Sequence, residues 1–435
     1  MGGNDSGGVD RLGGDSSGDA DAYAVLTEED FRAHWWPAVA SITRLVGDLA
    51  AAEDAVQDAV LAAMEQWPTR GVPANPRAWL ISVARHKALD SLRRQERRRT
   101  KEPEALRDWH EAVTPPPGPV PDDDQLGLIF MCCHPALDLP IQVALTLRAL
   151  CGLSTAEVAA LFLLPEPTMA KRLTRARRKI RDAGIRLQVP APESLADRLA
   201  GVLRVVYLVF TEGHKAATGG TLVRGHLCDL AIGLARGLHR LLPHEPEAMG
   251  LLALLLLIDA RRAARTDGAG NLVLLEDQDR RLWNQHMIRE GEQLLERALR
   301  RGRPGPYQLH AAIAACHSTA AEPAGTDWRQ IALLYGELLR YEPTPVVEAN
   351  RAIAIAMTEG PAAGLVILDT LGRHPQLSHW PQLHLARADL LRRLDRSSEA
   401  IDAYRTALKF PLSTAERTFI NSRIDQLNTS HDRRP

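Results

Sequence analysis

Apolar and basic residues recur with helical spacing in the stretch PTMAKRLTRARRKI, residues 167–180. The apolar residues fall on one narrow stripe of a helical wheel: Met169, Leu173, Ala176 and Ile180. The basic residues on the opposite side are Lys171, Arg175 and Arg178. The pattern predicts a helix with one buried face and one cationic face, although a solvated surface helix has the same pattern.

A second helix is predicted directly before this one. Ser154 and Glu157 have the spacing of a capping box, in which each side chain bonds the backbone N–H of the other residue. Pro165 must end this helix, and Pro167 suits the first turn of the next. A capped helix, a tight break and a cationic helix are typical of a helix-turn-helix, whose second helix enters the major groove of DNA. DNA binding is therefore favoured over a solvated surface.

An acidic helical face is predicted in AEDAVQDAVLAAMEQW, residues 52–67. Asp54, Asp58 and Glu65 share one side with Gln57, while small apolar residues occupy the rest of the wheel. The stretch contains no His or Cys that could complete a metal site. Such a face is either solvated or bound to a basic partner helix.

A long basic helix is predicted in NPRAWLISVARHKALDSLRRQERRR, residues 75–99, with Asn75 as its cap. One face of this helix carries Trp79, His86, Asp90, Arg93 and Arg97. An aromatic residue and arginines on one face are what phosphate contacts and base stacking require. Nucleic-acid binding is again favoured over surface charge.

The C-terminal half is rich in Ala, Leu and Arg and poor in β-branched runs, so the whole chain is predicted to be all-α. Its apolar run from Ala248 to Ile258 is too short to span a bilayer and fits a core helix. The apolar positions Leu199, Leu203 and Val206 follow the basic helix 167–180, and we expect them to pack against it.

A repeat is visible near the C-terminus. Five positions recur thirty-six residues later: Ala352, Gly364, Leu368, Leu371 and Pro375 become Ala388, Ala400, Tyr404, Ala407 and Pro411. The second copy is close to the tetratricopeptide pattern, and a fainter copy begins at Trp328. Stacked helical hairpins of this kind leave a concave surface for a peptide or protein, unless they form a packed extension without a partner.

Length and composition fit two or three domains in a chain of 435 residues with 45% hydrophobic content. The five cysteines lack a framework spacing, which indicates a reduced, cytoplasmic protein, and the N-terminus does not resemble a signal peptide. The expected segments are a disordered tail (1–22), a helical domain (23–109), a Pro-rich linker (110–124), the helix-turn-helix domain (125–187) and a repeat domain (193–427).

Two other polar groups were weighed as sites. Cys132-Cys133-His134 would chelate a metal poorly because its cysteines are adjacent, so a packed helix end is preferred. His214 and the group Asp259, Asp267, Asp277 and Asp279 fit helix capping and ion pairs better than a polar pocket. The sequence contains no phosphate-binding glycine loop or nucleophile elbow, so we expect no enzymatic activity, no metal and no cofactor.

Three stretches carry a family resemblance: AEDAVQDAVLAAMEQWP, NPRAWLISVARHKALDSLRR and LTLRALCGLSTAEVAALFLLPEPTMAKRLTRARRKI. In order and spacing they resemble regions 2.2, 2.3–2.4 and 4.2 of bacterial sigma factors of the extracytoplasmic-function type. The third block is similar to the large tetratricopeptide-type extension of one subgroup. The resemblance implies a non-enzymatic promoter-specificity subunit of bacterial RNA polymerase.

The resemblance also implies roles for individual residues. Core polymerase, through its beta-prime clamp helices, would bind Asp54, Gln57 and Asp58. The minus-10 element would meet Trp79, Arg85, His86, Lys87, Asp90, Arg93, Arg94 and Arg97, with a flipped base held by the loop from Pro68 to Asn75. The minus-35 element would meet Glu166, Thr168, Lys171, Arg172, Arg175 and Arg178.

Two alternatives remain at this point. A helix-turn-helix regulator with a repeat domain leaves the acidic face near Asp54 unexplained. A repeat-based adaptor or small-molecule-binding solenoid leaves both basic helices unexplained.

Overall fold

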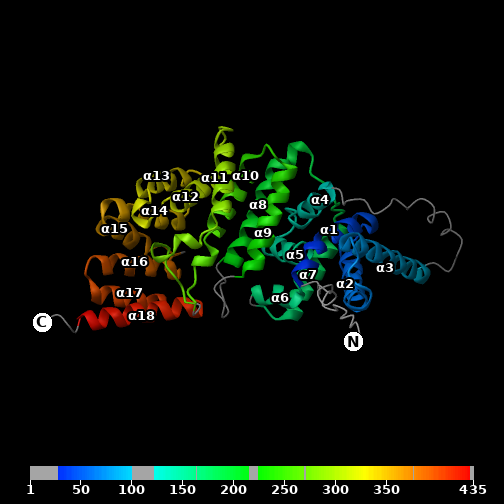
Figure 1. Cartoon of the computed structure of the whole chain (residues 1–435), viewed down its shortest axis with the longest axis horizontal. Coiled ribbons are helices and arrows are strands. Elements are labelled where there is room, and N and C mark those ends of the chain that lie inside the picture. Colours follow the sequence, from blue (N-terminus) through cyan, green and yellow to red (C-terminus); the bar gives the residue numbers. More distant parts are fainter. Residues whose placement is uncertain are drawn as a thin grey trace, which may run out of the picture. The chain divides into compact units, whose positions relative to one another are not determined.

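The computed structural model describes residues 28–99, 122–162, 164–214, 224–268, 271–375 and 377–431. Within these ranges the chain is helical apart from loops, short 3-10 turns and an isolated β-bridge between Thr266 and Leu272, which confirms the all-α prediction (Figure 1). The chain divides into two compact units, Met1–Pro121 and Asp122–Pro435. The predicted tail (1–22) and residues 110–121 of the predicted linker lie outside the described residues.

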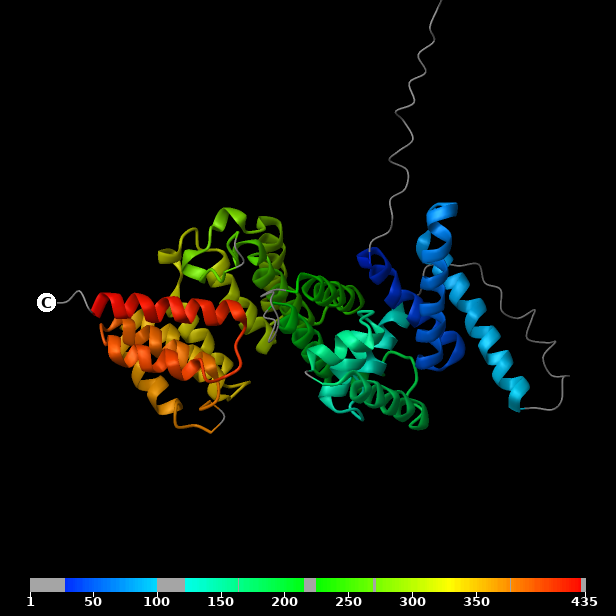
Figure 2. The ribbon, with the colours of Figure 1, turned by 90° about the horizontal axis from the view of Figure 1, so that it is seen from below.

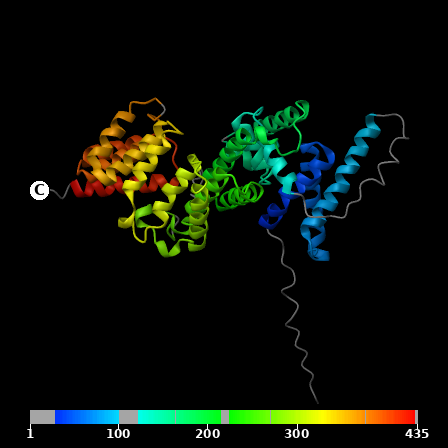
Figure 3. The same cartoon turned by 90° about the horizontal axis from the view of Figure 1, so that it is seen from above.

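The first unit consists, where it is described, of α1 (Glu28–Val46), α2 (Leu49–Arg70) and α3 (Pro76–Arg99), which all pack on one another (Figure 3). Asp48 caps α2 by accepting from the backbone N–H of Ala51 at 3.1 Å. The buried positions between these helices are mostly small, which lets the helices approach closely: Ala52, Ala55, Val56, Ala59 and Ala63 of α2, with Leu80, Ala84 and Ala88 of α3.

The second unit begins with α4 (Asp122–Cys132), α5 (Leu139–Ala149), α6 (Thr155–Leu161) and α7 (Glu166–Asp182). The acidic run 122–124 was expected to belong to the linker, but it forms the first turn of α4. Asp124 in this turn is buried, and an acidic residue is favourable there because it opposes the positive end of the helix dipole. The helix ends at Cys132, as predicted for a packed helix end.

The next helices are α8 (Pro192–His214), α9 (Gly225–Leu241), α10 (Pro246–Asp259) and α11 (Gln285–Leu299). Almost every side chain of α10 is buried between α9, α11 and α12, which confirms its assignment as a core helix. No described helix combines the length and the apolar character needed to cross a bilayer.

The apolar positions of α8 do not find the partner that we expected. Leu199, Leu203 and Val206 are buried, but α8 packs mainly on α9, α5, α10 and α4 rather than on the basic helix α7. Arg198 of α8 donates from Nη2 to the carbonyl oxygen of Phe130 in α4 at 2.6 Å, and its guanidinium lies 5.8 Å from the centre of that phenyl ring. The helix-turn-helix and the helices after it therefore share one packed unit.

The remaining helices follow one another as hairpins (Figure 2). Their bounds are α12 (Pro306–Ser318), α13 (Trp328–Leu338), α14 (Pro345–Glu359), α15 (Pro361–Leu371), α16 (Pro381–Arg393), α17 (Ser397–Ala407) and α18 (Thr414–His431). The hairpin α16–α17 begins thirty-six residues after the hairpin α14–α15, since their first helices begin at Pro381 and Pro345. This spacing matches the repeat seen in the sequence.

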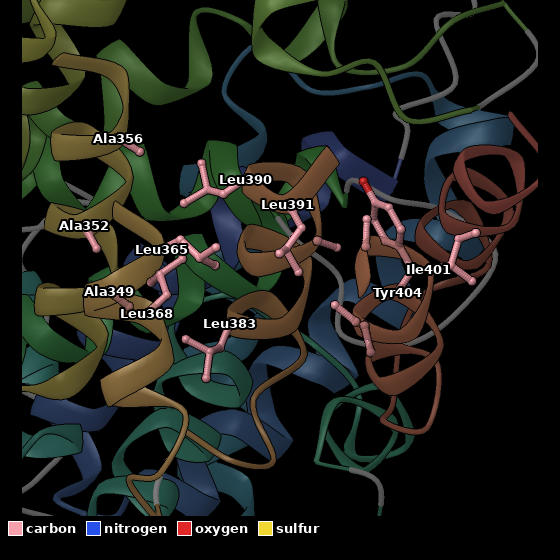
Figure 4. Close-up of a cluster of buried hydrophobic side chains, with 14 of the residues drawn as sticks. Ala349, Ala352, Ala356, Leu365, Leu368, Leu383, Leu390, Leu391, Ile401 and Tyr404 are labelled. Carbon is pink, nitrogen blue, oxygen red and sulfur yellow. The ribbon is translucent and has the colours of Figure 1, made fainter. Parts of the chain in front are cut away.

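Most of the repeated positions are buried within the hairpins, although Leu371 is half-buried and Pro375 and Pro411 are exposed. Side chains from α14, α15, α16 and α17 meet in a single apolar cluster (Figure 4). Gly364 is needed because a Cβ there would lie 2.5 Å from the carbonyl oxygen of Ala352 in α14. Its counterpart Ala400 is also fully buried, so the small residue of the pattern marks a close helix contact in both copies.

Candidate nucleic-acid interface

The cationic helix α7 is built as the sequence pattern predicts. The capping box before it is present, because Glu157 N donates to Ser154 Oγ at 3.1 Å and Ser154 N donates to Glu157 Oε2 at 2.7 Å. Pro167 lies in the first turn of α7. The buried residues of α7 are Met169, Leu173, Ala176 and Ile180. The helix-turn-helix is thus present, and its second helix turns the predicted cationic side to solvent.

The basic side chains on that side are exposed: Lys171, Arg172, Arg175 and Arg178. Arg178 is held by Asp182, with 3.2 Å between its Nε and the carboxylate Oδ2. Within the described residues, Lys171 and Arg175 form no ion pair with an acidic residue. Both cations are therefore available to a phosphate backbone, while Glu166 is exposed and Thr168 half-buried at the start of the helix.

The C-terminal end of α7 contacts the rest of its unit. The ammonium of Lys179 donates to the carbonyl oxygen of Ala136, in the loop between α4 and α5. α5 also packs directly on α7. The orientation of the cationic face is therefore set by α4 and α5, and these are the helices that α8 covers.

The second basic face lies on α3. Asn75 caps this helix, as predicted, by accepting from the N–H of Ala78 at 3.0 Å. His86, Lys87, Asp90 and Arg94 are exposed, and Arg85 and Arg93 are half-buried. The side chain of Arg97 lies outside the described residues.

Local contacts order part of this face. The Nδ1 atom of His86 lies 2.7 Å from the carbonyl oxygen of Ser82, and Arg93 forms an ion pair with Asp90 at 3.3 Å. Trp79 was expected to be available for base stacking. Its ring instead packs edge-on against Trp67 of α2, with 5.2 Å between the ring centres, which leaves it half-buried.

The loop expected from Pro68 to Asn75 is shorter than predicted. α2 continues through Pro68 to Arg70, and the non-helical segment starts at Gly71, whose φ of 80° lies in the region that favours glycine. Val72 in this loop is 40% exposed. An exposed apolar side chain beside a basic helix is compatible with contact to an unstacked base.

The acidic face of α2 is exposed, as its helical spacing predicts. Asp54, Gln57 and Asp58 all lie at the surface. The sequence reasoning missed two apolar neighbours one turn further on, Leu61 and Met64, whose side chains are 52% and 60% exposed. Their spacing from Gln57 and Asp58 was the signal that could have found them. Exposed apolar residues next to a charged patch are typical of a protein-binding surface.

The cysteine pair has the environment of a core, not of a metal centre. Cys132 and Cys133 are buried, and burial raises the pKa of the Cys133 thiol to about 12. A thiol of that kind is protonated at neutral pH and is a poor metal ligand. No cluster of His, Cys, Asp and Glu suitable for a metal ion occurs among the residues that the structure describes.

Three of the four aspartates considered above, Asp259, Asp267 and Asp279, form caps, turns or ion pairs, as expected. Asp259 binds Arg262 at 2.6 Å, and Asp279 accepts from the N–H of Arg281 at 3.0 Å. Asp267 accepts from Asn271 N at 2.8 Å and so closes a turn. Asp259 also lines an open cavity of about 660 Å³.

Comparison with known proteins finds separate family matches in successive parts of the chain. Residues 33–98 match sigma-70 region 2, residues 128–180 match sigma-70 region 4, and residues 198–299 match a family of unknown function, DUF6596. The first match covers α2, α3 and most of α1, the second ends within α7, and the third runs from α8 to α11. No solved structure matches the chain.

Individual relatives are similar to the chain over different lengths. An uncharacterized protein of Rhizobium meliloti (strain 1021) is 43% identical over 395 residues, which are 90% of this chain and 93% of that protein. The ECF RNA polymerase sigma factor SigL of Mycobacterium tuberculosis is 31% identical over 178 residues, 39% of this chain and 93% of SigL. The probable ECF RNA polymerase sigma factor SigI of the same species is 29% identical over 174 residues, 59% of its length.

Proposed function

The chain belongs to the extracytoplasmic-function sigma factors, with sigma-70 regions 2 and 4 followed by a DUF6596 extension, and we propose that it directs core RNA polymerase to a specific set of promoters. Both sigma regions are non-enzymatic binding domains that imply core polymerase and promoter DNA as partners. The protein acts where transcription takes place, in the cytoplasm.

The observation that carries this proposal is the cationic face of α7. Lys171, Arg172 and Arg175 are exposed on the side opposite the buried stripe, at the second helix of a helix-turn-helix. In the proposed complex these cations bind backbone phosphates at the minus-35 element and release condensed counterions. Glu166 and Thr168, at the N-terminal end of the helix, are the residues that meet base edges.

In the same proposal, α3 serves the minus-10 element. Lys87 and Arg94 contribute phosphate contacts from exposed positions. His86, Asp90 and the ion-paired Arg93 form the face that meets the bases. Trp79 contacts the DNA with only the part of its ring that Trp67 leaves uncovered. The short loop with Val72 takes the flipped base.

Core polymerase binds the acidic face of α2 in this proposal. Asp54 and Asp58 attract a basic helix of the beta-prime subunit, and Leu61 and Met64 give the contact an apolar component that charge alone lacks. An acidic rim beside exposed apolar side chains suits a partner that is both basic and amphipathic.

The C-terminal helical region is proposed to be a tetratricopeptide-like array that regulates the sigma regions or binds a protein or peptide. The thirty-six-residue spacing of the two hairpins and the close contact at Gly364 support this assignment. Since α8 packs on α4 and α5, the array is continuous with the unit that carries α7.

Transcription with purified components tests the role of the array. Deleting residues 345–435 keeps α12 on α10 and removes the two hairpins with the thirty-six-residue spacing. We expect reduced transcription from a cognate promoter with only core polymerase and DNA present. Equal transcription with the wild type and the deletion variant would exclude an intramolecular role of the hairpins and would favour binding of an external partner.

Co-purification tests the sigma assignment itself. Wild-type protein should form a complex with core polymerase, and Asp54→Lys with Asp58→Lys should abolish most of it because like charges would face each other. Glu193→Lys with Asp197→Lys is the matched control, since it makes the same charge change at two exposed positions with the same spacing on α8. Equal recovery of the double variant and the wild type would reject the proposed docking face.

A further inference from the structure

The segment between α10 and α11, residues 260–284, gathers arginine side chains around a buried tryptophan. The guanidinium carbons of Arg280 and Arg261 lie 4.3 Å and 5.9 Å from the centre of the Trp283 ring, which is 3% exposed. Arg280 Nη1 also donates to the carbonyl oxygens of His317 and Ala320, at 2.9 Å and 2.6 Å. The cluster therefore joins this segment to the end of α12.

Several donors in this cluster have no acceptor among the residues that the structure describes. The Nε atoms of Arg261 and Arg280 and the Nε1 atom of Trp283 are buried without a hydrogen-bond partner. Within the described part of the chain, the side chain of Arg261 forms neither a hydrogen bond nor an ion pair. Buried N–H groups nearly always have a partner in folded proteins, so a group of unmatched donors at one place calls for an acceptor.

The cations around Arg261 add an excess of positive charge to the unmatched donors. Arg265 and Arg280 are its charged neighbours, and together with burial they lower the pKa of Arg261 to about 10, so it remains charged at neutral pH. Arg265 donates to the carbonyl oxygen of His214, and burial lowers the pKa of Arg265 while the charge of Asp259 opposes that shift. Burial, together with the charges of Arg261 and Arg280, lowers the pKa of His317 to about 4, so His317 is neutral. Arg261 and Arg280 remain as uncompensated positive charges.

The nearby carboxylates are engaged elsewhere. Asp229 and Asp259 both bind Arg262, each at 2.6 Å. Asp279 binds Arg281 at 2.8 Å. The acids of this segment therefore neutralise a different set of arginines.

We propose that Arg261, Arg280 and Trp283 form a binding site for a small phosphate-bearing anion. Two guanidinium groups supply the donors and the charge that match a phosphate dianion, and the indole N–H adds a third donor. Both arginine side chains are partly exposed, which gives the anion a path from solvent. Bound there, the anion links the DUF6596 helices to the hairpins that follow and makes the extension responsive to phosphate or a phosphorylated metabolite.

The test is calorimetric titration of the full-length protein, without polymerase or DNA, so its outcome is independent of the proposed promoter function. Inorganic phosphate and AMP are the probes, and chloride at the same ionic strength controls for screening. Arg261→Gln should weaken phosphate binding at least tenfold. The matched control is Arg281→Gln, because Arg281 carries the same charge next to Arg280 but is 91% exposed and paired with Asp279.

Thermal unfolding adds a readout that does not need the ligand. Because the Nε atom of Arg261 is buried without an acceptor, the melting temperature of Arg261→Gln in chloride should equal or exceed that of the wild type. A lower value would show that Arg261 supports the fold and would overturn the proposal. The proposal would also be overturned if phosphate and AMP failed to bind the wild type, or if they bound Arg261→Gln as tightly as the wild type. Arg261-dependent binding of an acidic peptide alone would replace the proposal with a protein partner.

Discussion

Replacing Lys171 and Arg175 of α7 by Ala should reduce the salt dependence of promoter binding. Each phosphate contact contributes a slope of about 0.9 to the fall of log affinity with log salt, so two lost contacts remove about 1.8 from the slope. Between about 50 and 200 mM salt, this difference corresponds to about a twelvefold smaller loss of affinity for the variant. Alanine keeps the helix intact, because both residues are exposed and alanine is the best helix former.

The assay measures binding of the reconstituted holoenzyme to a cognate promoter fragment at several salt concentrations. Arg300→Ala is the control, because it removes the same charge from an exposed position just past the end of α11. The control should keep the wild-type slope. An unchanged slope in the Lys171 and Arg175 double variant would refute the assignment of this face to DNA.

Three further predictions concern the fold. Ser154→Ala should destabilise the unit that contains α6 by about 1 kcal/mol, measured by chemical unfolding, because it removes the acceptor for the N–H of Glu157; an unchanged midpoint would contradict this. Arg198→Ala should cost about 1.5–3 kcal/mol in the same assay, since it removes a charge-assisted bond to the Phe130 carbonyl. His317 is neutral when folded, with its pKa lowered from 6.5 to about 4, so the unfolded chain binds more protons between these values and stability falls as pH drops through them. His317→Gln should flatten that fall, and parallel pH profiles would refute the account.

Much of the sigma-like front could be predicted because its signals are local. The buried stripe of α7, the capping box at Ser154 and the cap at Asn75 depend on residues within a few positions of one another, so helical periodicity and capping chemistry are sufficient. The same holds for the exposed side of Asp54 and Asp58. The minus-10 and minus-35 roles of these residues stay predictions.

What the sequence did not reveal depends on contacts between distant residues. Arg198 and Phe130 are far apart along the chain, and no local pattern indicates that α8 covers α4 instead of α7. Trp79 has the helical position of a base-stacking residue, and only the packing of α2 on α3 shows that Trp67 occupies one side of it. The cluster at Arg261 likewise arises from a loop whose conformation periodicity does not determine.

The central claim is that this chain gives core polymerase promoter specificity, and mapping transcript starts tests it most directly. Genomic DNA of the source organism is transcribed by purified core polymerase alone, with the wild-type protein, or with the Asp54→Lys and Asp58→Lys variant, and the 5′ ends of the RNA are sequenced. The account predicts discrete start sites that appear only with the wild-type protein, share common upstream elements and disappear with the variant. Transcript starts that are the same with and without the wild-type protein would contradict it.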